Sequence, residues 1–220
     1  MTSNPVYSVL LVDDHPLFRR GVAQLVEDDS NFSLAGEASS AKEGIELAES
    51  LDPDVILMDL NMKEMNGIEA LAELRKKGVT AVIVIFTVSN AEKDILAAMK
   101  AGADGYLLKD CEPEDLMEKL RLAATGKSVL DDELVQIVTH ALREDKPTPP
   151  SSKSMLTARE KDILDLLAAC KSNKVIANEL GITDGTVKVH VKNLLRKLNL
   201  KSRIEAAVWA LEHQDNETSQ

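Results

Sequence analysis

Short apolar runs alternate with helical patterns over the first 125 residues. The runs lie at Tyr7–Val12, Phe32–Ala38, Val55–Met58, Ala81–Phe86 and Gly105–Leu108. Apolar runs of this length without polar alternation are typical of parallel strands covered on both faces. Apolar residues at helical spacing follow each run, in Pro16–Glu27, a helix opened by Ser40, Asn66–Lys77, Ala91–Ala101 and Pro113–Ala124. Five such units predict a doubly wound, flavodoxin-like α/β domain with a five-stranded parallel sheet.

The pattern changes after residue 154, where helical spacing continues without any strand pattern or proline. A capping box at Thr157 opens one helix, and Asn173–Leu180 and Asp184–Leu198 are predicted as two more, separated by a turn at Gly181. A further helix is predicted to begin near Ser202. A short helix, a glycine turn and a longer helix predict a small all-α helix-turn-helix domain.

The chain therefore divides into four parts. We predict an α/β domain at 1–128 and a helical domain at 155–211, followed by a polar tail at 212–220. Between the domains, 129–154 comprises an amphipathic helix, Asp131–Arg143, and a run with three prolines and three serines that is typical of a linker.

Charge is divided unevenly between the two domains. The net charge is −11, which by itself disfavours nucleic acid as a partner. However, residues 1–150 carry 15 basic and 28 acidic side chains, whereas residues 151–211 carry 11 basic and 6 acidic ones, a net of +5. The helical domain is therefore a basic module behind an acidic one.

The predicted helix 184–198 has an apolar stripe and an opposite face on which Lys188, Lys192 and Arg196 are spaced by four residues. This favours a recognition helix in a DNA major groove, with Lys188, Val189 and Lys192 at base edges. The phosphate contacts predicted around it are Arg196, Lys197, Lys201 and Arg203. On the last helix, the stripe Ile204, Ala207, Val208 and Leu211 either packs inward or forms a homodimer on DNA.

Two cysteines exclude a disulfide framework and a cysteine-rich zinc site. The N-terminal sequence has no basic start, and no apolar stretch approaches the length of a membrane span. We therefore expect a cytoplasmic protein with reduced thiols and no membrane partner.

Polar side chains stand where four of the predicted strands end. Asp13 and Asp14 follow the first, Asp59 the third, Thr87 the fourth and Lys109 the fifth. Parallel strands bring their carboxyl ends to one edge of the sheet, where sites form in this class of fold. Three carboxylates in one cleft repel one another and favour a cation such as Mg²⁺.

A carboxylate in such a cleft can act as a nucleophile and form an aspartyl phosphate, with Thr87 and Lys109 contacting the phosphoryl oxygens. Taken alone, an Asp that follows a strand is more often a helix cap than part of a reactive site.

His15 either joins the carboxylate cluster or lies beside it. A Mg²⁺-dependent phosphohydrolase is an alternative, although Asn61 stands where such an enzyme has a second acid.

The motifs at these positions resemble response-regulator receiver domains: Leu-Val-Asp-Asp-His at 11–15, Leu-Met-Asp-Leu-Asn-Met at 57–62, Phe-Thr-Val-Ser at 86–89 and Gly-Tyr-Leu-Leu-Lys-Asp at 105–110. The resemblance implies that a sensor histidine kinase phosphorylates Asp59. It implies Mg²⁺ bound by Asp13, Asp14, Asp59 and the Asn61 carbonyl, with Thr87, Lys109 and Tyr106 as switch residues. Asp110 departs from the family pattern, which often has proline there, and leaves the isomer of the Lys109–Asp110 bond open.

The helical domain resembles LuxR-type helix-turn-helix domains through Leu-Thr-Ala-Arg-Glu at 156–160, Asn-Lys-Val-Ile-Ala at 173–177 and the segment 186–198. Together the domains resemble the NarL/FixJ family of two-component response regulators, and most of all its nitrate/nitrite regulators. This implies a transcription regulator rather than an enzyme, with double-stranded DNA and RNA polymerase as partners. A protein-interaction adaptor whose basic helix binds an acidic partner remains an alternative. We expect the acidic domain to cover the basic helix until phosphorylation.

Overall fold

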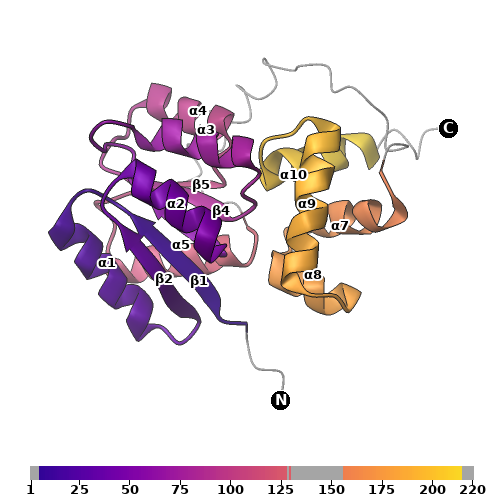
Figure 1. The fold of residues 1–220 in the computed structure, drawn as a ribbon, viewed down its shortest axis with the longest axis horizontal. Coiled ribbons are helices and arrows are strands. Elements are labelled where there is room, and N and C mark those ends of the chain that lie inside the picture. Colours follow the sequence, from indigo (N-terminus) through magenta and orange to yellow (C-terminus); the bar gives the residue numbers. More distant parts are fainter. Residues whose placement is uncertain (1–4, 128, 130–155, 215–220) are drawn as a thin grey trace.

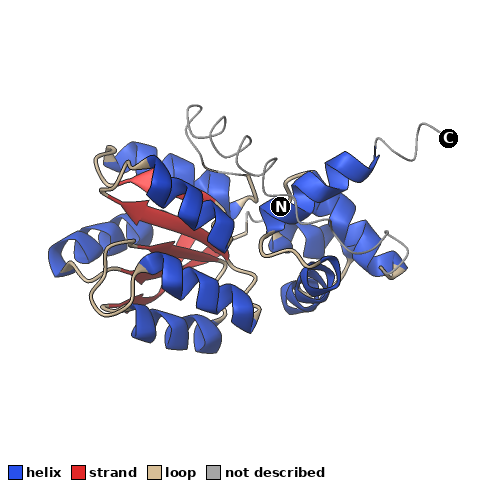
Figure 2. Cartoon of the chain, turned by 90° about the horizontal axis from the view of Figure 1, so that it is seen from above, coloured by secondary structure: helices blue, strands red, loops and turns tan. Residues whose placement is uncertain are grey.

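The computed structural model describes residues 5–127, 129 and 156–214. The predicted helix Asp131–Arg143 and the linker after it lie outside the described residues. Within the described residues, no helix is long and apolar enough to cross a membrane. The described chain forms two domains that contact each other (Figures 1 and 2).

The N-terminal domain is a five-stranded parallel sheet in the order β2-β1-β3-β4-β5. The strands are β1 Tyr7–Val12, β2 Phe32–Ala38, β3 Val55–Met58, β4 Val82–Thr87 and β5 Gly105–Leu108. The helices are α1 Pro16–Asp28, α2 Ala41–Leu51, α3 Gly67–Lys77, α4 Glu92–Ala101 and α5 Pro113–Ala124. The doubly wound fold predicted from the sequence is confirmed.

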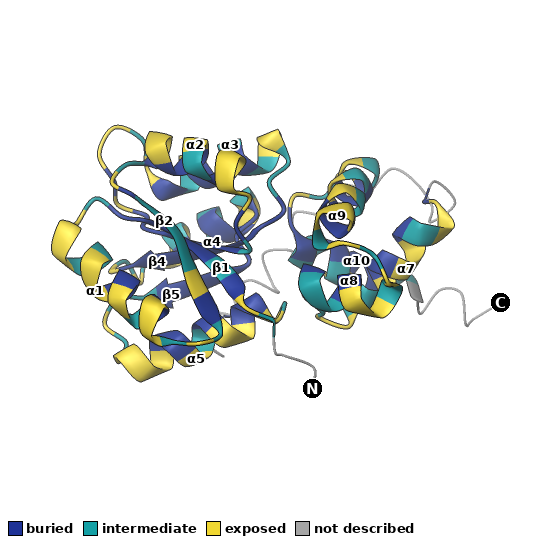
Figure 3. Ribbon diagram, turned by 60° about the horizontal axis from the view of Figure 1, so that its bottom comes forward, coloured by how far each residue is buried: buried dark blue, intermediate teal, exposed yellow. Residues whose placement is uncertain are grey.

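The strands are rich in apolar residues because helices cover both faces of this sheet. Alternate β1 residues divide between two cores: Leu10 and Val12 pack with α2, α3 and α4, whereas Val9 and Leu11 pack with α1 and α5. Because both faces are covered, β1, β3, β4 and β5 are apolar at nearly every position instead of alternating, whereas the edge strand β2 is only partly buried. Figure 3 shows the buried strands between exposed outer helix faces.

The C-terminal domain consists of α7 Ala158–Ala168, α8 Asn173–Leu180, α9 Asp184–Leu198 and α10 Arg203–Gln214. It has its own core, which includes Leu164, Val191 and Trp209. Gly181 ends α8 in the left-handed region at φ 64°, and the Thr183 side chain caps α9. The predicted helix-turn-helix is confirmed, while α10 continues into the predicted polar tail.

Candidate functional site

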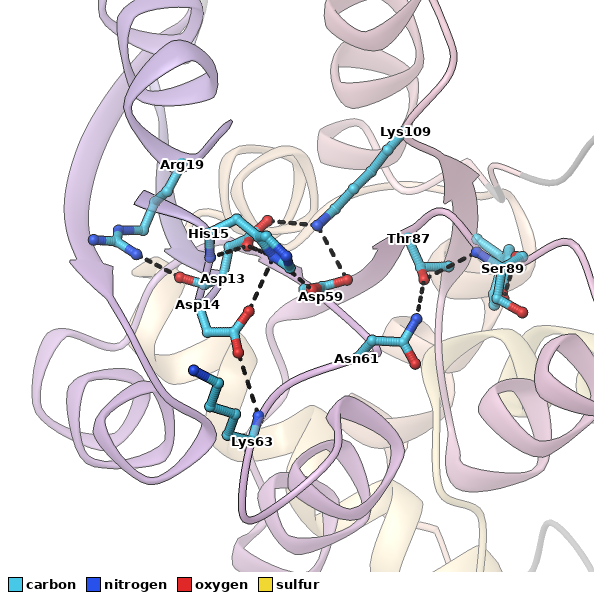
Figure 4. A network of polar contacts seen from close by, with 11 residues as sticks. Asp13, Asp14, His15, Arg19, Asp59, Asn61, Lys63, Thr87, Ser89 and Lys109 are labelled. Carbon is cyan, nitrogen blue, oxygen red and sulfur yellow. Dashed lines mark hydrogen bonds and ion pairs between the residues drawn. The ribbon is translucent and has the colours of Figure 1, made fainter. Parts of the chain in front are cut away.

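The carboxyl edge of the sheet gathers the polar residues predicted there (Figure 4). Asp13 and Asp14 follow β1, Asp59 follows β3, Thr87 ends β4 and Lys109 follows β5. The chain reaches this edge after every strand because all five are parallel.

Lys109 joins two of the carboxylates. Its Nζ lies 2.7 Å from Asp13 Oδ2 and 3.1 Å from Asp59 Oδ1, and its side chain is only 8% exposed. Burial raises the pKa of Asp59, against the lowering effects of Lys109 and of the Asn61 backbone N–H. The second Asp59 oxygen, Oδ2, is buried and has no hydrogen-bond partner. A buried oxygen without a donor is costly unless a bound group satisfies it.

The donor set fits a hard divalent cation. Asp13, Asp14, His15 and Asp59 each offer one ligand atom, and these atoms lie within 4.8 Å of one another. Three carboxylates from two strands suit Mg²⁺, which takes oxygen ligands. His15 belongs to this cluster, because its Nδ1 lies 3.0 Å from Asp14 Oδ1 and 3.8 Å from Asp59 Oδ2.

Gly67 fixes the backbone beneath Asp59. A Cβ added at Gly67 would lie 2.2 Å from the carbonyl oxygen of Asp59, so only glycine allows this approach. The Gly67 N–H donates to the Leu60 carbonyl at 2.9 Å, and Asn66 caps α3 with a capping box. The start of α3 thereby holds the loop that carries Asp59.

Thr87 is held by two donors. Its Oγ1 accepts from Asn61 Nδ2 at 3.3 Å and from the Ser89 N–H at 3.2 Å. The Tyr106 hydroxyl donates to the Ser89 carbonyl at 2.8 Å, and its ring is fully buried. Burial raises the pKa of Tyr106 to about 12. A continuous hydrogen-bonded path therefore joins Asn61, Thr87, Ser89 and Tyr106. Figure 4 shows its part from Asn61 to Ser89.

The described residues contain no cis peptide bond, so the Lys109–Asp110 bond is trans. This answers the question that the missing proline leaves open in the sequence.

Lys188 and Lys192 on α9, and Lys201 shortly after it, contact the α/β domain. Lys188 Nζ donates to the Asp52 carbonyl at 2.8 Å and lies 3.0 Å from Asp52 Oδ2. Lys192 donates to the Lys77 carbonyl at 3.0 Å, and Lys201 donates to the Lys100 carbonyl at 2.9 Å. These carbonyls lie at the C-terminal ends of α2, α3 and α4, where helices leave acceptors unsatisfied and carry partial negative charge.

Other predicted DNA contacts are divided between surface and interior. Val189 is 59% exposed and Arg196 is exposed, while Lys197 lies 2.6 Å from Glu160. Arg203 is buried and donates to the Lys171 carbonyl, and burial lowers its pKa. In this conformation Arg203 supports the domain interior instead of lying on the surface predicted for phosphate.

The predicted dimerisation stripe on α10 is partly buried and partly exposed. Ile204 packs against the core of the α/β domain, and Ala207 is half-buried. Val208 and Leu211 are 41% and 54% exposed.

A second contact between the domains was not predicted. The Tyr7 hydroxyl lies 3.2 Å from Ser172 Oγ, and Lys174 lies 2.8 Å from Asp54 Oδ2. Gly126 approaches the Cys170 backbone closely enough that a Cβ would lie 2.8 Å from its carbonyl oxygen. No spacing in the sequence marks these residues, because they meet only when the domains pack.

Two families match the chain. Residues 9–121 match the response regulator receiver domain, and residues 154–210 match the bacterial regulatory proteins of the luxR family. The chain is a two-component response regulator with a LuxR-type DNA-binding domain.

Its curated relatives include nitrate/nitrite regulators. The chain is 52% identical over 215 residues to the nitrate/nitrite response regulator protein NarL of Escherichia coli K12, covering 98% of this chain and 99% of that protein. It is 49% identical over 206 residues to NarP of the same strain, covering 94% and 95%. A nitrate/nitrite response regulator homolog from Haemophilus influenzae is 48% identical over 204 residues, covering 93% and 96%.

Solved structures agree with the fold. A LuxR-family two-component response regulator from Aurantimonas sp. SI85-9A1 has a TM-score of 0.57 and 31% identity, covering 61% of this chain and 96% of that one. The receiver domain of a NarL regulator from Mycobacterium tuberculosis has a TM-score of 0.54 and 28% identity, covering 56% and 99%. These relatives are regulators rather than enzymes, so neither the phosphohydrolase nor the adaptor alternative is retained.

Proposed function

We propose that a partner sensor histidine kinase phosphorylates this chain on Asp59. The observation that carries the proposal is the buried Asp59 Oδ2 without a donor, beside the Lys109 ammonium and two further carboxylates. A carboxylate oxygen of Asp59 attacks the phosphorus of a phosphohistidine, the P–N bond breaks, and the imidazole nitrogen takes up a proton. The transferred phosphoryl group brings negatively charged oxygens to Asp59, where the Lys109 ammonium is placed to neutralise their charge and the Thr87 hydroxyl to donate a hydrogen bond.

Asp13, Asp14 and Asp59, with the Asn61 carbonyl, would hold Mg²⁺. When bound, the cation would neutralise charge on the phosphoryl oxygens and reduce repulsion among the carboxylates. The 4.8 Å cluster of ligand atoms supports this assignment.

The hydrogen-bonded path from Thr87 to Tyr106 would carry the switch. Thr87 Oγ1 already accepts from Asn61 and Ser89, so its own proton is free to be donated to a phosphoryl oxygen. Movement of Thr87 would pull on Ser89, which also contacts Tyr106 and Asp94 at the start of α4. The far end of α4 accepts from Lys201, so this helix joins the phosphorylation edge to the DNA-binding domain.

The contacts of α9 support autoinhibition before phosphorylation. Lys188 is only 9% exposed because it lies against Asp52, so this predicted base contact cannot reach a major groove in this conformation. Phosphorylation would weaken this packing and free Lys188, Lys192 and Lys201. These lysines would then contact DNA together with Val189, Arg196 and Lys197. A further opening of α10 would be needed to place Arg203 at phosphate.

The released domains would bind operator DNA as a homodimer through α10, where Val208 and Leu211 are exposed. RNA polymerase is a further proposed partner at the promoter, and the cytoplasm is the proposed location. The similarity to NarL and NarP favours genes of nitrate- and nitrite-responsive anaerobic respiration as targets.

The test is genomic binding, with and without a phosphodonor, for the wild type and for Asp59→Asn. The wild type should gain sites on phosphorylation, whereas Asp59→Asn should not. Asp28→Asn changes an exposed carboxylate on α1 and should behave as the wild type. Undiminished, donor-dependent occupancy by Asp59→Asn would overturn the proposal.

A further inference from the structure

Phe18 occupies an unassigned position beside the site. It lies in the first turn of α1, soon after the two carboxylates that follow β1. The Phe18 ring centroid lies 4.6 Å from Lys109 Nζ. A cation at this distance from an aromatic ring is attracted by the negative potential of the ring face.

The Phe18 ring is itself fixed in place. Its centroid lies 5.3 Å from that of Phe86, with a tilt of 46° between the rings. Phe86 is 4% exposed on β4, directly before Thr87. The two rings, with Asp13 and Asp59, line a small cavity beneath the carboxylates. Phe18 is thus anchored to the sheet that carries the switch threonine.

The Phe18 ring is an uncharged partner of Lys109, whereas the other two partners, Asp13 and Asp59, are carboxylates. An ammonium has three protons, and the Asp13 and Asp59 carboxylates account for two directions of donation. The ring attracts the cation without adding negative charge to the cluster. Lys109 is therefore held near Asp59 Oδ1 by a neutral group that will not compete for the phosphoryl group or for Mg²⁺.

We propose that Phe18 is a positioning residue for phosphoryl transfer, which holds the Lys109 ammonium at Asp59 through a cation–π contact. The inference rests on the proposed phosphorylation of Asp59. In this role Phe18 acts through Lys109 and needs no contact of its own with phosphate or Mg²⁺. A pre-positioned ammonium stabilises the charge that develops on the transferring group without reorganising during the reaction.

The test varies the charge distribution of the ring at nearly constant size. Phenylalanine analogues with increasing fluorine substitution at position 18 weaken the negative ring face in steps. Rates of Asp59 phosphorylation by phosphoramidate should fall in the same order, by about threefold to tenfold across the series. Phe18→Leu should be phosphorylated as slowly as the most fluorinated chain. Phe18→Trp, which keeps an aromatic ring, should be phosphorylated at about the wild-type rate.

A second measurement is independent of phosphate. The ε-CH₂ protons of Lys109 should show a ring-current shift by NMR in the wild type, and the shift should disappear in Phe18→Leu. A missing shift in the wild type, or phosphorylation rates that do not respond to fluorination, would overturn the role of Phe18 alone. A wild-type chain that takes up no phosphate on Asp59 would overturn the proposed function, and this inference with it.

Discussion

At the scale of single residues, the site around Asp59 depends on a glycine, Gly67, as much as on its charged groups. Asp59 can stand beside the start of α3 only because Gly67 has no Cβ, which would otherwise lie 2.2 Å from the Asp59 carbonyl oxygen. Backbone cannot yield as a flexible side chain can, so the loop itself would have to move.

Gly67→Ala should therefore destabilise the α/β domain by about 1–3 kcal/mol and slow phosphorylation of Asp59. Gly21→Ala is the matched control, since nothing lies within 4 Å of a Cβ at this position on α1. The control should stabilise the chain by about 0.5–1 kcal/mol, because alanine favours helix. Urea unfolding followed by circular dichroism checks both, and equal effects of the two substitutions would contradict this account.

At the scale of elements, α10 presents two exposed apolar side chains next to a buried tryptophan. Val208 and Leu211 are exposed, whereas Trp209 is 4% exposed. Substitutions at the first two positions should therefore leave the domain folded.

Val208→Asp and Leu211→Asp should each weaken DNA binding of the phosphorylated chain by about tenfold or more, because a charge would be buried in both halves of a symmetric contact. The fluorescence of Trp209, the single tryptophan, should remain native. Gel shifts and sedimentation measure affinity and dimer formation. Full affinity in both variants would exclude this face of α10 from the dimer.

The sequence predicts elements well where local rules determine them. The bounds of β1, β2, β3, β5, α8 and α9 agree with the structure to the residue, because apolar runs and caps fix them. β4 is displaced by one position and includes Thr87, while Asn66 and Ala91, predicted as helical, are N-caps. N-caps are only half within a helix, so periodicity alone places them poorly.

The site is predicted less completely than the fold. Asp13, Asp59 and Lys109 meet because strand ends share one edge, which topology alone requires. The partners of Lys188 and Lys192 are backbone carbonyls, which have no sequence signature. The inward position of Arg203 likewise follows from tertiary packing, which the basic pattern around it does not reveal.

At the scale of the whole molecule, an ion pair between Asp52 and Lys188 is one of the contacts that join the two domains. Asp52 Oδ2 lies 3.0 Å from Lys188 Nζ, but Asp52 is itself largely exposed. The pair should contribute only modestly, as exposed pairs do.

Asp52→Asn should raise DNA binding by the unphosphorylated chain by about twofold to fivefold, since it weakens closure without changing the DNA-binding domain. Asparagine also tolerates the left-handed backbone at this position, where φ is 45°. Glu49→Gln, which breaks an ion pair with Lys77 on the same domain, is the control and should change nothing. A gel shift without phosphodonor measures both, and a decrease for Asp52→Asn would argue against autoinhibition.

Closure should also depend on pH. Burial raises the pKa of Asp184, at the start of α9, and of Glu205, at the start of α10. Their charged neighbours include Lys188, Lys174 and Asp54 for the first, and Lys201, Arg75 and Asp104 for the second. If separation of the domains returns Asp184 and Glu205 to their ordinary pKa values of 3.8 and 4.5, the closed form binds more protons than the open form. This difference applies in the pH range between the ordinary pKa values and the raised ones.

Lowering the pH through this window should therefore stabilise the closed form, and raising the pH should loosen it. Small-angle scattering of the unphosphorylated chain should show a radius of gyration that increases with pH. The double variant Asp184→Asn, Glu205→Gln should lose this dependence. An unchanged dependence in the double variant would assign it to other groups.

The helix ends that receive Lys188, Lys192 and Lys201 have a consequence for how the regulator can evolve. A backbone carbonyl is present whichever amino acid occupies its position, so the receiver surface can change in sequence while these acceptors persist. The three lysines cannot be replaced in the same way if their side chains also contact DNA. Selection that strengthened or relaxed closure through them would alter promoter affinity as well, so lineages are expected to adjust the balance on the receiver side, at positions such as Asp52.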